Sequence, residues 1–180
     1  ASVSNVIILT VAGVLFALTL PLFAAEAIYN LRLERWRLFY RFVFTIPLVI
    51  PWVVTVLVWS FFYDPIDGPL NLFLQSIGLG NYTRAWLADP KIAIYAIVMI
   101  GGGGTGVGFP FVAGLNLLIY LAGLNSIPTE TMEAAKLDGT SWRQRFLYID
   151  LPLIKGQIRL ILILTMITQI QAFQTIILLT

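Results

Sequence analysis

The chain has 180 residues, of which 59% are hydrophobic and only 11% are charged, and its mean hydropathy is +0.90. A soluble domain carries roughly 25% charged residues, so we expect lipid to be the main solvent of this chain. The absence of Cys and His excludes disulfides, thiolate or imidazole metal sites and Ser-His-Asp catalysis, and a net charge of +2 provides no basic patch for nucleic acid.

The charged residues fall in three segments, 26–41, 64–91 and 130–159, and the uncharged stretches around them have 25, 22, 38 and 21 residues. About 20 helical residues cross the hydrocarbon core, and a charge at its centre costs roughly 2.5–3.5 kcal/mol. Four such stretches therefore predict at least four membrane crossings. The Lys and Arg counts of the three segments are 4, 2 and 5. The positive-inside rule then places the first and third segments in the cytoplasm and the second outside.

The first predicted crossing runs from about residue 4 to residue 25. A cleavable signal peptide is the alternative, because Ala24-Ala25-Glu26-Ala27 resembles a cleavage site, but the stretch lacks a basic n-region. The second crossing, about 42–63, contains Pro47 and Pro51, which predict kinks inside a helix bundle. The outer segment that follows reads as turns around a short amphipathic stretch at 70–77.

The third predicted crossing, about 92–124, is too long for one straight helix, and six of its residues at 101–108 are glycines. Each glycine costs roughly 1 kcal/mol relative to Ala inside a helix, so we expect a break near 101–108. Such a break is typical of a segment that lines a transport pathway, and small residues equally favour close helix packing. The last crossing is expected at about 157–179.

The segment at 125–156 reads as a cytoplasmic pair of short helices. We expect the hydroxyls around Pro128 to cap a first helix that runs to about Asp138 and stops at Gly139. Ser141-Trp142-Arg143-Gln144 matches a capping box for a second helix through about Ile149. A hairpin resting on lipid is the alternative, but such helices are rich in Lys and Arg and the first helix is net acidic, so we expect a protein partner.

Three parts of this segment closely resemble the EAA signature of permease subunits in binding-protein-dependent ABC importers: Glu133-Ala134-Ala135-Lys136-Leu137-Asp138-Gly139, Phe146, and Ile149-Asp150-Leu151-Pro152. Further stretches resemble the maltose-type carbohydrate permeases, among them Trp86-Leu87-Ala88-Asp89-Pro90, Gly108-Phe109-Pro110 and Leu124-Asn125-Ser126-Ile127-Pro128. The resemblance implies an all-α, polytopic membrane helix bundle of the MetI-like permease fold. Residues 1–180 would form a single transmembrane permease domain, an internal fragment of a six-helix core.

The resemblance also implies roles for particular residues. The loop at 125–156 would couple the permease to an ATPase subunit through Glu133, Ala134, Ala135, Asp138 and Gly139. The substrate pathway would be lined by Gly104, Val107, Gly108, Phe111, Thr165, Thr168, Gln169 and Ala172. No catalytic or metal-binding residue and no cofactor is expected in this chain, because ATP and Mg would be bound by the partner ATPase.

The implied partners are a second permease subunit, two cytoplasmic ATPase subunits, an extracytoplasmic solute-binding protein and a carbohydrate, at a bacterial cytoplasmic (inner) membrane. Glycerol-phosphate or another polar solute is the alternative substrate. A secondary transporter is disfavoured because it would need an intramembrane ionisable group, which the four uncharged stretches lack. A purely structural membrane subunit would leave the EAA signature unexplained, and no residue names the sugar.

Overall fold

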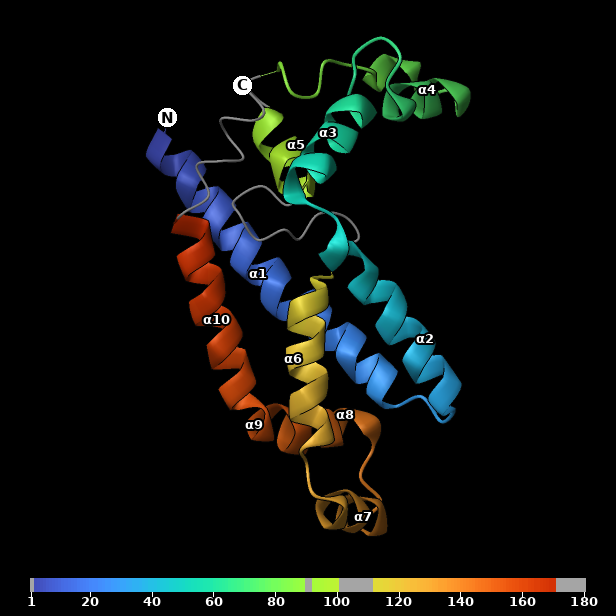
Figure 1. The fold of residues 1–180 in the computed structure, drawn as a ribbon, viewed down its shortest axis with the longest axis vertical. Helices are drawn as coiled ribbons and strands as arrows, with labels where there is room; N and C mark the ends of the chain where they lie inside the picture. Colours follow the sequence, from blue (N-terminus) through green and yellow to red (C-terminus); the bar gives the residue numbers. More distant parts are fainter. Residues whose placement is uncertain (1, 90–91, 101–111, 171–180) are drawn as a thin grey trace.

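The computed structural model describes residues 2–89, 92–100 and 112–170 of the chain. Every regular element in these three ranges is helical (Figure 1), which confirms the predicted all-α class. The α-helices are α1 (Ser2–Tyr29), α2 (Glu34–Thr45), α3 (Trp52–Phe62), α4 (Pro69–Ser76), α5 (Ala93–Ile100), α6 (Gly114–Asn125), α7 (Thr129–Leu137), α8 (Trp142–Arg145), α9 (Leu151–Leu153) and α10 (Lys155–Ile170). Short 3-10 helices at Ile46–Val49 and Gly80–Tyr82 and a π-helical turn at Phe146–Asp150 complete them.

The main core forms where α1, α6 and α10 pack together and meet the segment that joins α6 to α10 (Figure 1). Its buried members are apolar side chains from all of these elements: Leu22, Ala25, Ile28, Leu117, Tyr120, Leu121, Leu124, Ile127, Phe146, Ile154 and Ile161. Tyr120 is fully buried and extends from α6 to α1. The junction between the bundle and the 125–156 segment is therefore part of the core.

Polar bonds from α6 support a proline inside α1. Pro21 has no backbone N–H, so the carbonyl of Ala17, four residues earlier, loses its helical donor. The Asn116 Nδ2 donates to the Ala17 oxygen at 3.1 Å, and the Tyr120 hydroxyl donates to the Leu18 oxygen at 3.1 Å. The Asn116 amide thus replaces the hydrogen bond that Pro21 removes from α1, and the Tyr120 hydroxyl adds a second bond beside it.

The second predicted crossing is sharply bent. Its two parts, Glu34–Val49 and Val53–Phe62, meet at 95°, and Pro51 stands at the N-cap of the second part. This confirms the kink that the prolines predict. The first part begins at Glu34 rather than near residue 42, because Glu34 supplies the acid that a helix N-terminus favours.

Among the described residues, Thr10–Tyr29 is the one helix that is long and apolar enough to cross a membrane. The number rises to three if each bent pair counts as one span, the second pair being Trp142–Leu153 with Lys155–Thr168, bent by 66°. The helix α6 is apolar but shorter. The break predicted near 101–108 and the end of the last crossing lie outside the described residues, so the four crossings stay a prediction.

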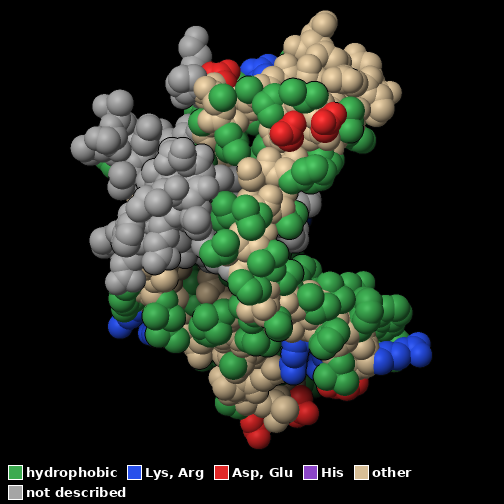
Figure 2. All heavy atoms as spheres, turned by 45° about the horizontal axis from the view of Figure 1, so that its top comes forward, with side chains coloured by type: hydrophobic (Ala, Val, Ile, Leu, Met, Phe, Trp, Pro, Cys, Tyr) green, Lys and Arg blue, Asp and Glu red, His purple; other side chains and the backbone are tan. Residues whose placement is uncertain are grey.

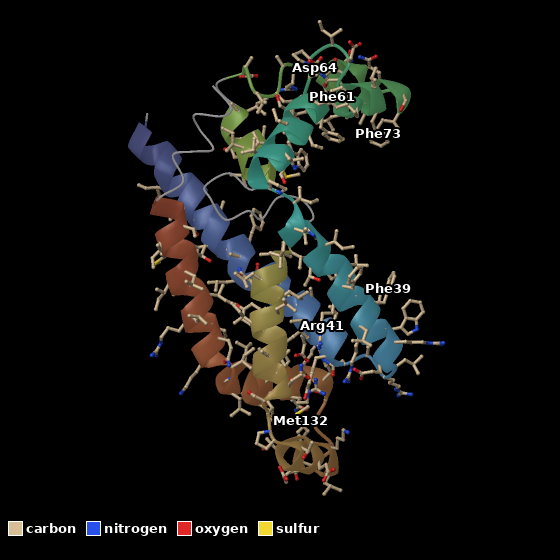
Figure 3. All side chains as sticks on the ribbon, viewed as in Figure 1. Phe39, Arg41, Phe61, Asp64, Phe73 and Met132 are labelled. Carbon is tan, nitrogen blue, oxygen red and sulfur yellow. The ribbon has the colours of Figure 1, made fainter. Side chains whose placement is uncertain are left out.

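The charged segments lie toward the two ends of the molecule. Figure 1 shows α7 and the link between α1 and α2 toward one end of the long axis, with α4 at the other. In Figure 3, Asp64 lies near α4 and Met132 lies on α7, while Phe39 points away from the bundle. Figure 2 shows hydrophobic side chains over much of the visible surface between the charged groups of the two ends. This arrangement agrees with the alternation of charged segments along the sequence.

The outer segment is held by a buried asparagine. Asn71 of α4 is fully buried; its Nδ2 donates to the carbonyls of Pro65 at 3.1 Å and Arg84 at 3.0 Å. Its Oδ1 accepts the Trp86 indole N–H at 2.8 Å. The amphipathic stretch at 70–77 falls largely within the helix α4.

Candidate functional site: the coupling segment and its attachment

The helix α7 is a short exposed helix with a defined end. It runs over Thr129–Leu137 and stops at Gly139, whose φ of +65° suits glycine better than any other residue. The expected hydroxyl cap at its start is wrong: Pro128 stands at the N-cap with no side-chain bond. The Ser126 hydroxyl instead donates back to the Gly123 carbonyl at 2.7 Å, because Ser126 is the C-cap residue of α6.

We call the helical stretch 142–153, which comprises α8, the π-helical turn and α9, the second arm. It begins with the predicted capping box. The Ser141 hydroxyl accepts from the Gln144 backbone N–H, and the Gln144 side chain accepts from the Ser141 N–H at 2.9 Å. The arm continues past the predicted end near Ile149, through the π-helical turn, to Leu153. A π turn carries one extra residue, which rotates the side chains that follow it. Here the turn ends on Asp150, a buried acid.

One face of α7 is exposed and mixes acids with small and apolar side chains. Glu130, Glu133, Ala134 and Leu137 recur every three or four residues, so they share a face, and each is exposed. Leu137 is 89% exposed, which is unusual for a leucine. On the opposite side, Met132 packs against the core.

The five predicted coupling residues do not all face the same way. Glu133, Ala134, Asp138 and Gly139 are exposed, whereas Ala135 is buried. The Ala135 carbonyl accepts both the backbone N–H and the hydroxyl of Thr140, at 3.1 and 2.7 Å. Ala135 therefore closes the turn after α7 and is turned away from any partner of the exposed face.

The second arm is attached to α1 by a cluster that the sequence analysis missed. The Arg145 guanidinium donates to Glu26 Oε1 at 2.8 Å and to Asp150 Oδ2 at 3.0 Å, and it also donates to Asn30. The Trp142 indole N–H donates to Glu26 Oε1 at 3.2 Å. We call Glu26, Asn30, Trp142, Arg145 and Asp150 the attachment cluster.

Burial controls the electrostatics of the attachment cluster. The side chains of Glu26 and Asp150 are 1% and 0% exposed, and that of Arg145 is 16% exposed. Burial raises the pKa of Asp150, and the nearby Glu26 carboxyl raises it further, while Arg145 opposes the shift. Burial alone would lower the pKa of Arg145, but Asp150 and Glu26 together raise it. Glu26 Oε2 and Asp150 Oδ1 are buried without a hydrogen-bond partner among the described residues.

The sequence did contain signals for this cluster. Glu26 is the one charged residue of α1, and Asn30 follows it by four residues on the same helical face, where its amide donates to Glu26 at 2.7 Å. The charge pattern, however, places Glu26 in the cytoplasmic segment 26–41 and predicts no buried partner for it. The match to Arg145, 119 positions later, requires the packing of α8 against α1 and is not visible in a local pattern.

Most of the predicted pathway residues lie outside the described residues. Gly104, Val107, Gly108, Phe111 and Ala172 belong to that group. On α10, Thr165 is buried. The Thr168 hydroxyl donates to the Leu164 carbonyl at 3.1 Å or to the Thr165 carbonyl at 2.9 Å. Only the backbone of Gln169 is described. The pathway assignment therefore stays a prediction.

The coupling segment lies within a stretch that a protein family covers. The family described as "Binding-protein-dependent transport system inner membrane component" matches residues 17–180. The chain belongs to this family. Its match covers α1 from residue 17 onward, the attachment cluster and α7. It agrees with the resemblance that the EAA signature carries.

Named relatives in the family are sugar permeases. The chain is 34% identical over 140 residues to the trehalose/maltose transport system permease protein MalF of Thermococcus litoralis, covering 78% of the chain and 44% of that protein. It is 31% identical over 177 residues to the diacetylchitobiose uptake system permease protein NgcF of Streptomyces coelicolor, covering 94% and 48%. The chain thus spans about half the length of the curated relatives it matches.

Solved structures agree with the fold. A bacterial ABC transporter involved in the import of the acidic polysaccharide alginate matches with a TM-score of 0.82 and 26% identity, over 98% of this chain and 59% of that one. The alginate transporter in complex with an alginate pentasaccharide-bound periplasmic protein matches with a TM-score of 0.77 and 24% identity, over 90% and 53%. These matches confirm the MetI-like, all-α permease fold.

Proposed function

We propose that the chain is part of the transmembrane subunit of an ATP-driven importer and that α7 docks on a cytoplasmic ATPase subunit. The observation that carries this proposal is the exposed face of α7, with Glu133 beside a leucine, Leu137, that is 89% exposed. Among the described residues, Glu133 makes no hydrogen bond or ion pair. A helix face of this composition suits a groove with an apolar floor and a basic rim, because a charge-assisted contact fixes the orientation of the helix.

A lipid surface would suit this face less well. Glu130 and Glu133 of α7, with Asp138 at its C-cap, outnumber Lys136, whereas helices that lie on anionic lipid carry Lys and Arg on their polar face. The second arm then braces α7 from behind, because Met132 packs into the core. The subunit itself carries out no covalent chemistry in this proposal; the ATPase subunits bind ATP and Mg and hydrolyse the ATP.

The substrate that we propose is a carbohydrate, an oligosaccharide by analogy. The relatives are named for trehalose, maltose and diacetylchitobiose, and the similar structures are described with alginate. An extracytoplasmic solute-binding protein would deliver the sugar, and a second permease subunit would complete the cavity at the bacterial cytoplasmic membrane. Alternating access of that cavity would move the sugar inward. Glycerol-phosphate remains the alternative, and it would differ by requiring a cationic site.

The docking proposal is tested on the intact permease, purified with its ATPase. Leu137→Asp should weaken ATPase binding at least about tenfold, because burying a leucine contributes about 1.5–3 kcal/mol and each 1.4 kcal/mol is a factor of ten. Glu133→Gln should weaken it in the same direction. Leu33→Asp is the matched control, since Leu33 is an exposed leucine in the link between α1 and α2. Unchanged ATPase binding by Leu137→Asp would show that α7 does not dock.

The substrate is tested separately in proteoliposomes that contain the complete transporter. ATP-dependent uptake of a labelled oligosaccharide that is abolished without the solute-binding protein supports the carbohydrate proposal. Uptake of glycerol-phosphate that oligosaccharides do not inhibit would favour the alternative. Uptake driven by an ion gradient without the ATPase would refute the importer proposal.

A further inference from the structure

We propose that Glu26, Arg145 and Asp150 form a clamp through which the movement of the coupling segment is transmitted to α1. These three are positioning residues: they touch neither substrate nor ATPase but hold α8 and the last turn of α1 together as one body. The inference rests on the proposed function, in that α7 is taken to receive its movement from an ATPase subunit. It goes further by naming the side chains that pass that movement into the membrane.

The geometry of Arg145 is that of a fork between two elements. Its Nη2 donates to Glu26 of α1 at 2.8 Å, and its Nε donates to Asp150 of its own arm at 3.0 Å. Both bonds are charge-assisted, and the bond to Glu26 lies within the short range that is typical of such bonds. A lysine offers a single point charge and cannot hold both acceptors in this fixed planar arrangement. The π-helical turn brings Asp150 to the position that the second branch of the fork needs.

Further bonds converge on the same carboxylate. Glu26 Oε1 accepts from Asn30 Nδ2 at 2.7 Å and from Trp142 Nε1 at 3.2 Å, in addition to Arg145. Trp142 also stacks on Phe146, with ring centroids 5.8 Å apart, and Phe146 contacts Phe23 of α1 at 5.9 Å. An aromatic contact and a polar contact therefore join the second arm to α1 next to each other.

Burial makes this attachment persistent. Separation of the arm from α1 would break the bonds of Glu26 to Arg145 and Trp142 and the contact between Phe23 and Phe146. Removing one partner by mutation would leave an uncompensated buried charge. The ion pair between Glu34 and Arg37 provides a contrast. Its atoms lie 4.0 Å apart and its side chains are 76% and 34% exposed, and exposed pairs of this kind contribute little. We therefore expect α1 and the arm to move together while α7 is displaced.

The first test compares sugar uptake with ATP hydrolysis in proteoliposomes that contain the complete transporter. Glu26→Gln keeps the shape and one acceptor but removes the charge, and Arg145→Lys keeps the charge but removes the fork. In both variants we expect the ATPase to bind and hydrolyse ATP, while the sugar transported per ATP falls roughly fivefold or more, the lower range of allosteric coupling. Glu34→Gln is the matched control and should leave the ratio unchanged.

The outcomes separate the clamp from the proposed function. An unchanged ratio of uptake to hydrolysis in both variants would overturn the clamp, and so would a parallel fall of both activities, which marks a merely structural role. Neither result affects the docking of α7, which depends on Leu137 and is measured by ATPase binding. Combining Glu26→Gln with Arg145→Lys should cost less than the sum of the two single changes, because both weaken the bond between Glu26 and Arg145.

A second test leaves the three clamp residues intact. Asn30 and Trp142 both donate to Glu26 Oε1, so their side chains lie next to each other, and the 180 residues contain no Cys. Asn30→Cys and Trp142→Cys can therefore be joined by a short thiol-specific cross-linker, with each single variant treated alone as a control. We expect the cross-linked transporter to keep the uptake of the untreated double variant. Loss of uptake on cross-linking would show that the two elements must separate, which contradicts the clamp.

Discussion

The hydrogen bond between Asn116 and α1 gives the sharpest stability prediction. Asn116 donates to the Ala17 carbonyl, which Pro21 leaves without a helical donor. Asn116→Leu preserves much of the volume but removes the donor, so this carbonyl loses its partner between two packed helices. We expect the variant to unfold more easily than the parent for this reason alone.

Two considerations bound the magnitude. A buried polar group left without a partner costs about 1–3 kcal/mol, whereas hydrogen bonds between membrane helices average roughly 0.6 kcal/mol and reach about 1.7. We therefore expect about 1–1.5 kcal/mol for Asn116→Leu. In a Pro21→Ala background the new N–H can donate to Ala17 within the helix, so the same change should cost about 1 kcal/mol less. The double-mutant cycle isolates this difference.

The assay is reversible unfolding of the intact purified permease in mixed detergent micelles, followed by the fluorescence of its tryptophans. Asn125→Leu is the matched control, because Asn125 is exposed at the other end of α6, and its effect should stay within about 0.5 kcal/mol. If Asn116→Leu costs the same with alanine as with proline at position 21, the Ala17 carbonyl does not depend on Asn116. The repair of α1 by α6 would then be refuted.

Three further predictions use the same unfolding measurement. Gly114→Ala should lower the free energy of unfolding by about 1–3 kcal/mol, because its Cβ would lie 2.5 Å from a backbone oxygen of α2. Gly156→Ala has open space around it and should raise the free energy of unfolding by about 0.5 kcal/mol. Equal effects of the two changes would contradict this packing. Asn71→Ala should cost about 1–3 kcal/mol by stranding the Trp86 indole N–H, with faster hydrogen exchange of the outer segment, and unaltered exchange would argue against that role. Burial raises the pKa of Asp150, so the folded protein binds this proton more tightly than the unfolded chain does. The stability from this group is present below about pH 4 and is lost as the pH rises through the raised pKa. Asp150→Asn should remove that part of the pH dependence, and an unchanged curve would speak against it.

The sequence predicted the coupling segment in detail because its signals are local. The stop of α7 at Gly139 and the capping box at Ser141 depend on residues within a few positions of each other. The hydroxyl cap before α7 failed for a local reason as well: Ser126 lies close enough to the end of α6 to bond to Gly123. Two elements competed for that hydroxyl, and the composition of the segment gave no way to choose between them.

The attachment of this segment to the bundle was not predictable in the same way. A pattern of charges identifies Glu26 as water-facing, because most acids near the end of an apolar stretch are solvated. Its burial depends on Arg145, which reaches it from 119 positions away. The bond that compensates for Pro21 is equally non-local, since Asn116 lies 99 positions from Ala17. Non-local polar pairs of this kind are a property of the packed helices.

These two pairs also determine how the other elements are aligned along α1. The carbonyl of Ala17 accepts from α6, and Glu26 accepts from α8 nine residues later, which is about 13 Å along the helix. Any helix has backbone acceptors, but the Ala17 carbonyl that Pro21 frees has no donor within its own helix. A slip of α6 by one turn would strand the Asn116 amide, and a slip of α8 would strand the Arg145 guanidinium. A proline and a single buried acid thus set the register of the bundle and of the coupling segment against the same helix.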